Sequence, residues 1–165
     1  MTAGSQIRMT GLPPVITKDA EVLVLGSFPS RQSLETGQYY ANPNNQFWKV
    51  IEALFGIDRT LPYRVRTSLL SKHHIALYDA IGSCRRTGSA DSRIRNPVLN
   101  DIPALLASYP NIRFVACNGS TSAKYAARLD LPDSVTLIRL PSTSPAYAAM
   151  SLKDKITCWS VFLQG

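Results

Sequence analysis

One stretch decides the fold of this chain: Val24-Leu-Gly-Ser-Phe-Pro-Ser-Arg-Gln-Ser-Leu-Glu-Thr-Gly-Gln-Tyr-Tyr-Ala-Asn-Pro-Asn-Asn-Gln-Phe-Trp48. It begins in an apolar run that breaks abruptly at Gly26, as a buried parallel strand does where it reaches the carboxyl edge of its sheet. Two adjacent tyrosines and three asparagines around one proline follow. Amide side chains can read a base edge or hold a water molecule, and aromatic rings can stack on a base. The stretch therefore predicts a strand followed by a binding loop.

The length and composition of the chain predict a single soluble domain. Its 165 residues are enough for one domain over residues 1–165, in which we expect residues 1–10 to be a flexible lead-in. No apolar run approaches the roughly 20 residues that span a bilayer, and the first residues lack the apolar segment of a signal peptide. We therefore expect a cytoplasmic protein with no membrane contact.

The cysteines and histidines argue against a metal centre. Cys84, Cys117 and Cys158 are widely spaced and form no C-x-x-C pair, which disfavours a zinc site, an iron–sulfur cluster or a disulfide framework. His73 and His74 are adjacent, so they cannot face the same way on a strand. We expect no metal, no iron–sulfur cluster and no other cofactor.

The charge of the chain is strongly positive, with 18 Lys and Arg residues against 11 Asp and Glu residues and a net charge of +7. Such an excess attracts polyanions, and nucleic acid is the first candidate. Because many basic proteins bind no nucleic acid, charge alone leaves DNA or RNA binding open.

Apolar segments with strand character alternate with segments of helical period, which predicts an α/β fold with a parallel sheet covered on both faces. We expect strands at residues 21–26, 74–78, 112–117 and 135–140. We expect helices at residues 45–55 and 63–72, from the cap Asn100 through Ala107, after Gly119 (with Tyr125 and Leu129), and after Ser151, which with Asp154 resembles a capping box. Residues 82–97, with four arginines, are either a solvated loop or an arm that contacts phosphates.

Polar loops follow all four predicted strands, at residues 27–30, 79–83, 118–122 and 141–145. Because the carboxyl ends of parallel strands meet at one edge, we expect these loops to converge on one cleft. They contain no Ser/His/Asp set and no phosphate-binding loop with glycine and lysine. This inventory suits a reaction whose barrier falls by positioning water and stabilising charge.

Two motifs together resemble those of a known family. They are Gly26-Ser-Phe-Pro-Ser30 followed by Gly37-Gln-Tyr-Tyr-Ala-Asn-Pro-Asn-Asn-Gln-Phe-Trp48, and Leu140-Pro-Ser-Thr-Ser-Pro-Ala146. They are similar to the uracil-DNA glycosylase superfamily, in its hypoxanthine-DNA (deoxyinosine) glycosylase branch, from about Gly11 to Phe162. The resemblance implies an α/β three-layer sandwich, with a central four-stranded parallel sheet flanked by helices.

The same resemblance implies a monofunctional DNA glycosylase of base excision repair. Such an enzyme flips a deaminated base out of DNA and hydrolyses its N-glycosidic bond. Hypoxanthine is the expected base, with uracil and xanthine as further candidates, and the expected partner of this monomer is DNA that contains them. The motifs hold no lysine to form a Schiff base with the sugar, which makes the enzyme monofunctional.

The motifs depart from the superfamily at two positions. Phe28 stands where Asp or Asn is frequent, and Leu140 stands where His or Asn is frequent. By resemblance the catalytic role passes to Asn42, with Asn45 as the second candidate. An asparagine can orient a water molecule but cannot act as its base at neutral pH, so we predict catalysis by positioning.

The resemblance and the loop chemistry assign the other site residues to the base or to phosphates. Tyr40 stacks on the base or belongs to the core; Asp79 accepts from N1–H of hypoxanthine or caps a turn; Asn118 reaches the base or closes the turn before Gly119. The base-binding set is Gly26, Ser27, Phe28, Tyr40, Asp79 and Asn118. The phosphate-binding set is Ser30, Ser142, Thr143, Ser144, Arg85 and Arg86, of which residues 142–144 are alternatively a simple turn.

Two other functions remain open at this point. A non-catalytic module of the same fold that binds damaged or single-stranded DNA would explain the apolar Phe28 and Leu140. A small-molecule nucleoside hydrolase would suit the loop chemistry, although the positive charge suits it less well.

Overall fold

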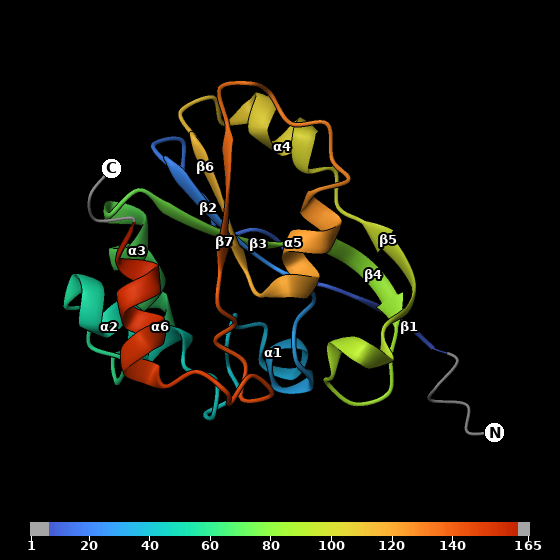
Figure 1. Cartoon of the computed structure of the whole chain (residues 1–165), viewed down its shortest axis with the longest axis horizontal. Helices are drawn as coiled ribbons and strands as arrows, with labels where there is room; N and C mark the ends of the chain where they lie inside the picture. The colour runs from blue at the N-terminus through green and yellow to red at the C-terminus, as the bar shows by residue number, and fades with distance from the viewer. Residues whose placement is uncertain (1–6, 162–165) are drawn as a thin grey trace.

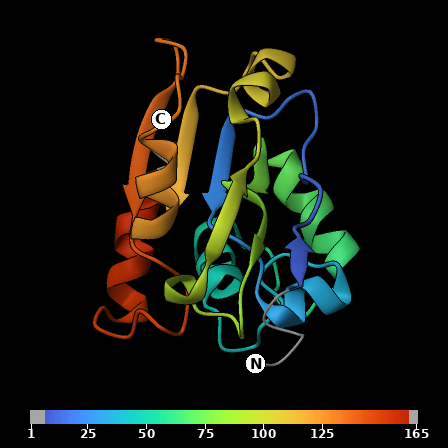
Figure 2. The same cartoon turned by 90° about the vertical axis from the view of Figure 1, so that its right-hand side faces the viewer.

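A four-stranded parallel sheet lies at the centre of the computed structural model, which describes residues 7–161 (Figure 1). Its strands lie in the order β3-β2-β6-β7. They are β2 (Val22–Gly26), β3 (Ile75–Asp79), β6 (Phe114–Asn118) and β7 (Thr136–Leu140). In the register, Val24 lies opposite Leu77 of β3 and Ala116 of β6. The arrows of β2, β6 and β7 point the same way in Figure 2, so these strands end at one edge, as predicted.

The sheet is buried because helices cover both of its faces. In the central strand β2, Leu23, Val24 and Leu25 are all fully buried, which explains why the strand reads as a continuous apolar run. On one side lie α2 (Phe47–Phe55), α3 (Tyr63–Lys72) and α6 (Leu152–Trp159), and on the other lie α4 (Ile102–Ser108) and α5 (Ser120–Ala126). The predicted three-layer sandwich is confirmed. Across the described residues, no helix is both long enough and apolar enough to pass through a membrane.

The helix boundaries differ from the predicted ones where side chains cap the backbone. Asp101, and not Asn100, caps α4, because its Oδ1 accepts the N–H of Ala104 at 3.0 Å. Asn100 instead donates its side-chain amide to the carbonyl oxygen of Asp79 at 2.8 Å. The predicted cap of α6 is confirmed, since the Ser151 hydroxyl accepts the N–H of Asp154 at 3.1 Å.

Two further helix predictions need correction. The helix α2 begins at Phe47 and not at Asn45. The helix α5 ends at Ala126, so Leu129 lies beyond it, and Phe162 lies outside the described residues. A short helix that we did not predict, α1 (Arg31–Thr36), begins after Ser30, whose hydroxyl accepts the N–H of Ser33 at 3.2 Å.

A second, antiparallel sheet replaces the predicted loop over residues 82–97. It contains β1 (Arg8–Thr10), β4 (Ile81–Arg85) and β5 (Arg95–Leu99) in the order β1-β4-β5, with the 3₁₀ turn η2 (Asp91–Arg93) between β4 and β5. Its inner side packs Cys84 and Ile81 against Phe28. The expectation of a flexible lead-in is therefore wrong for residues 8–10, while residues 1–6 lie outside the described part.

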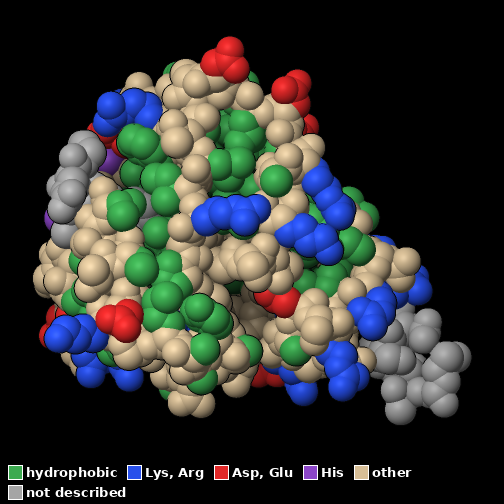
Figure 3. Space-filling model, viewed as in Figure 1, with side chains coloured by type: hydrophobic (Ala, Val, Ile, Leu, Met, Phe, Trp, Pro, Cys, Tyr) green, Lys and Arg blue, Asp and Glu red, His purple; other side chains and the backbone are tan. Residues whose placement is uncertain are grey.

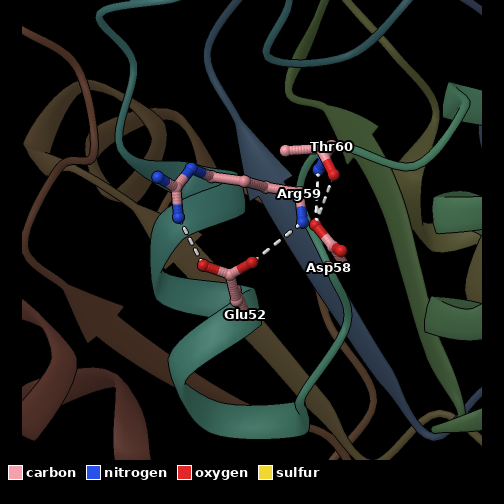
Figure 4. A network of polar contacts seen from close by, with 4 residues as sticks. All are labelled: Glu52, Asp58, Arg59 and Thr60. Carbon is pink, nitrogen blue, oxygen red and sulfur yellow. Dashed lines mark hydrogen bonds and ion pairs between the residues drawn. The ribbon is translucent and has the colours of Figure 1, made fainter.

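The connection between α2 and α3 is fastened by a network of polar contacts (Figure 4). The Arg59 guanidinium forms an ion pair with the Glu52 carboxylate, and the backbone N–H of Arg59 donates to the same carboxylate at 3.1 Å. The Asp58 carboxylate accepts from the hydroxyl and the N–H of Thr60, which lowers the pKa of Asp58. This network fixes the turn that leads into α3.

Candidate active site

The carboxyl edge of the parallel sheet opens into a cavity of about 880 Å³, seen as the hollow below the centre of Figure 3. Its wall is formed by the loops after β2, β6 and β7, by Tyr39, Tyr40, Asn42 and Asn45, by the end of β3 and by residues 89–92. The predicted catalytic and base-binding residues all line it, as do four of the predicted phosphate contacts; together these are Gly26, Ser27, Phe28, Ser30, Tyr40, Asn42, Asn45, Asp79, Asn118, Ser142, Thr143 and Ser144. The predicted convergence is confirmed for the loops after β2, β6 and β7. Of the fourth predicted loop, residues 79–83, only Asp79 lines the cavity, because β4 begins at Ile81.

Asp79 places an unpaired carboxyl group on the wall of this cavity. The residue is 5% exposed, and Oδ2 has no hydrogen-bond partner among the described residues. Gly26 lies against Oδ1, where a side chain of any size would clash. Burial raises the pKa of Asp79 to about 7; the nearby Asp91 raises it too, and Arg86 lowers it. A buried acceptor without a partner is unfavourable, so this site is suited to a ligand that donates a hydrogen bond.

Asn118 ties the loop after β6 to the loop after β7. Its Oδ1 accepts the N–H of Thr143 at 3.0 Å, and its Nδ2 donates to the Thr143 hydroxyl at 3.0 Å and to the Tyr40 hydroxyl at 3.3 Å. Thr143 is fully buried. Both ends of the Asn118 amide are therefore engaged within the protein, and the residue holds the shape of the cavity wall.

Tyr40 and Tyr39 have different surroundings although they are adjacent. The ring of Tyr40 stacks on Phe47, with centroids 4.0 Å apart and planes inclined by 20°. Its backbone φ is +57°, which is uncommon for a non-glycine residue. Tyr39 belongs to the core and donates its hydroxyl to the carbonyl oxygen of Pro13 at 2.8 Å. Both residues line the cavity, and Tyr40 is the more exposed of the two.

Asn42 and Asn45 have matching environments. Oδ1 of Asn42 accepts the N–H of Asn44 at 2.9 Å, and Oδ1 of Asn45 accepts the N–H of Phe47 at 2.9 Å. Each oxygen keeps a second lone pair, and neither side-chain NH₂ has a partner in the described part of the chain. Both amides line the cavity and can hold a water molecule, so the geometry favours neither one.

The comparison with known proteins identifies the family of this fold and site. A model of the Uracil DNA glycosylase superfamily matches residues 13–163. The chain belongs to the uracil DNA glycosylase superfamily.

Relatives in this superfamily are similar over nearly their whole length. The chain is 32% identical over 155 residues to a protein of Methanosarcina barkeri named hypoxanthine DNA glycosylase, covering 93% of this chain and 97% of that one. It is 33% identical over 150 residues to a protein of the same name from Methanosarcina acetivorans, covering 90% and 94%. A solution NMR structure of a candidate uracil DNA glycosylase from Methanosarcina acetivorans superposes with a TM-score of 0.83 at 31% identity, covering 94% and 96%. The predicted family and fold are confirmed.

Phe28 and Leu140, the apolar residues at motif positions where the superfamily often has polar ones, are both buried. Phe28 is 7% exposed and belongs to the cluster beneath the β1-β4-β5 sheet. Leu140 is 6% exposed and belongs to the main core. The polar side chains that line the cavity therefore belong to other residues.

Arg85 and Arg86, the two arginines predicted to contact phosphates, have different surroundings. Arg86 is 4% exposed; it donates to the carbonyl oxygens of Pro29 at 2.7 Å and Gly88 at 2.8 Å, and its guanidinium lies 5.1 Å from the Phe28 ring centroid. The expected position of Arg86 on an exposed arm is wrong, because the arm is folded back onto the β2 loop. Arg85 lies half-buried on the second sheet, outside the cavity wall.

Residues 89–92 form a part of the cavity wall that the sequence did not predict. Ser27 donates its hydroxyl to Oδ1 of Asp91 at 2.8 Å, which joins the β2 loop to η2. No local signal marks Asp91, since the segment is polar and has no periodicity. Lys155, which does not line the cavity, is a buried charged residue that the sequence did not indicate: it is 1% exposed and donates to Oε1 of Gln46 and to the carbonyl oxygen of Tyr147, both at 2.8 Å.

Proposed function

We propose that this superfamily member is a monofunctional DNA glycosylase of base excision repair that removes hypoxanthine from deoxyinosine. The observation that supports this function best is the unpaired, buried carboxyl of Asp79, which shares one cavity with the amides of Asn42 and Asn45. The names of the two Methanosarcina relatives support the same substrate. Uracil and xanthine are further candidate substrates, and the proposed working form is a cytoplasmic monomer.

In the proposed complex the flipped base lies in the cavity, and Asp79 reads its edge. Ionised Oδ2 accepts a hydrogen bond from N1–H of hypoxanthine, and adenine has no hydrogen at N1. Gly26 leaves the space that the carboxylate occupies. The ring of Tyr40, supported from behind by Phe47, provides the stacking surface.

Asn42 orients the attacking water, and Asn45 is the second candidate for this role. Neither amide is a base at neutral pH, so the rate enhancement comes from holding the water near the sugar carbon while the cavity stabilises the developing charge.

The loop after β7 contributes contacts to the phosphates beside the flipped nucleotide. Ser142 and Ser144 accept backbone N–H groups through their hydroxyl oxygens, which leaves each hydroxyl hydrogen free to donate. Ser30 differs, because its hydroxyl accepts the N–H of Ser33 and donates to the Ser33 hydroxyl at 3.2 Å, so a phosphate would have to replace that second bond. The buried Thr143 acts through the shape of the loop. Of the two arginines first considered, Arg85 is the one with a partly exposed side chain.

A test of this function uses a duplex that contains one deoxyinosine. Wild-type protein followed by alkali should produce strand breaks at that position, and no breaks should form without alkali. Asn42→Ala should lower the single-turnover rate by roughly 100-fold or more, since positioning effects of this kind contribute several kcal/mol. Asn44→Ala is the matched control, because Asn44 is exposed and does not line the cavity.

The results distinguish the roles of the two cavity amides. If Asn45→Ala loses the activity and Asn42→Ala keeps it, the water belongs to Asn45. If wild-type protein binds the duplex and releases no base, the alternative of a non-catalytic DNA-binding module is correct, which the buried Phe28 and Leu140 would then explain.

A further inference from the structure

The outer side of the β1-β4-β5 sheet carries three arginines in one row across the strands. Arg8 lies opposite Arg85 in the β1–β4 pair, and Arg85 lies opposite Arg95 in the β4–β5 pair. Residues directly opposite each other on neighbouring strands extend from the same face of a sheet. The neighbouring pair Met9 and Cys84 belongs to the apolar cluster on the inner side, so the arginine row lies on the outer side.

The charges of this row are not compensated within the protein. Like charges directly opposite each other on a sheet are destabilising, and none of the three arginines forms an ion pair among residues 7–161. Their partners are neutral: Arg8 donates to the Ser83 hydroxyl at 2.9 Å and to the carbonyl oxygen of Asn96 at 2.7 Å, and Arg95 donates to two backbone carbonyls. Nε of Arg85 is buried and has no hydrogen-bond partner in the described chain. With no acidic partner among residues 7–161, the row leaves its positive charge available to an external anion.

The row lies beside the cavity. The segment that joins Arg85 to Arg95 includes residues 89–92, which line the cavity wall. At about 3.3 Å per residue, Arg85 is at most about 13 Å from Ser89. Figure 3 shows Lys and Arg side chains gathered at the lower right, on the side of the molecule where Figure 1 places β1 and β4.

We propose that Arg8, Arg85 and Arg95 bind the phosphate backbone of DNA beside the nucleotide that occupies the cavity. The inference rests on the proposed function for the nature of the polymer, and it adds a second contact surface to the one formed by the β7 loop. Arginines bind phosphate through several donors at once. Such contacts fix the register of the protein on DNA and add affinity without reading the sequence.

The test compares two triple variants that remove the same charge. Arg8, Arg85 and Arg95 are changed to Gln in one; in the control, Lys72→Gln, Arg113→Gln and Arg128→Gln neutralise exposed side chains near the opposite edge of the parallel sheet. Binding to an undamaged duplex is followed by fluorescence anisotropy over a series of salt concentrations. The row variant should lower the slope of log K against log salt by about 2 to 3, since each phosphate contact contributes about 0.9, and the control should change it by less than 1.

A third protein with Lys at the three row positions keeps the charge and should keep most of the slope, which separates charge from loss of folding. Equal slopes for wild type and the Gln row variant, or equal losses in the row variant and the control, would overturn the proposal. The measurement uses undamaged DNA, so it does not depend on base release. If wild-type protein releases the base but the Gln row variant has an unchanged salt slope, only the role of the arginine row is refuted. If the Gln row variant has a reduced slope but wild-type protein releases no base, only the glycosylase function is refuted.

Discussion

In the proposed function, the chemistry of the cavity depends most on Asp79. Its backbone carbonyl accepts from Asn100, its Oδ1 lies against Gly26, and its Oδ2 is left for a ligand. A group placed in this way reduces stability in the free protein, because a buried carboxylate loses its hydration. Both the stability of the fold and the reaction are therefore expected to respond to the protonation of this one side chain.

The stability of the protein should depend on pH through Asp79. Burial raises its pKa to about 7 from an ordinary value of 3.8, so between these values the folded state holds a proton that the unfolded chain has released. The contribution of Asp79 to the free energy of unfolding therefore decreases as pH rises from about 4 to 7. Asp79→Asn removes this contribution. In urea denaturation, the free energy of unfolding of the variant relative to that of wild type should therefore increase by a few kcal/mol from pH 4 to pH 8. A stability difference that is the same at both pH values would contradict the assignment.

Base release should respond to the same titration in the opposite direction. The proposed acceptor is ionised Asp79, so kcat/KM on deoxyinosine DNA should rise with pH through about 7 and then level off. In Asp79→Asn the rise should be absent, and the value at pH 8 should fall by roughly fivefold to tenfold, as expected when a neutral acceptor replaces a charged one. An unchanged preference for inosine over adenine in this variant would exclude the role.

At the scale of elements, the hairpin of β4 and β5 completes the cavity. It is fastened to the loop after β2 by the hydrogen bonds from Arg86 to Pro29 and from Ser27 to Asp91. The shape of the cavity therefore depends on contacts between the two sheets as well as on the strand ends of the parallel sheet.

Arg86 should behave as an internal tie of this hairpin. Arg86→Met should lower the free energy of unfolding by about 2–4 kcal/mol, because two buried carbonyl oxygens lose a charged donor. Thermal unfolding measures this loss of stability. Fluorescence anisotropy on the same variant should show that the salt dependence of DNA binding hardly changes. A variant of unchanged stability whose salt slope falls by about 0.9 would instead identify Arg86 as a phosphate contact.

At the scale of the whole molecule, the positive charge is distributed unevenly over the surface, which the net charge of +7 does not show. Part of it is paired with acidic groups away from the cavity, as at Arg59 with Glu52 and Arg113 with Glu21. The row on the second sheet is unpaired and close to the cavity. The general attraction to polyanions predicted from composition therefore becomes a specific surface in the folded chain.

The sequence by itself determined the central sheet, the helices that cover it and the convergence of the strand-end loops. A strand buried on both faces is a continuous apolar run, as at Val22–Gly26, and a capped helix carries its signal within a few residues, as at Ser151. These signals are local, so they are readable without knowing what the segment contacts. The place of Asp79 follows from them, because it lies at the end of a predicted strand. Asn42 and Asn45 lie between α1 and α2, and they were assigned through the family resemblance.

Only the tertiary structure decided the second sheet, the wall formed by residues 89–92 and the arginine row. The strands of this sheet are largely polar, with one side open to solvent, so their sequence resembles that of a loop. Its contacts join residues far apart in the chain: Arg8 pairs with Arg85, and Ser27 with Asp91. Periodicity reports which face of a segment is buried and not which distant segment covers it. For that reason the same arginines are a scattered basic segment in the sequence and one continuous row in the folded protein.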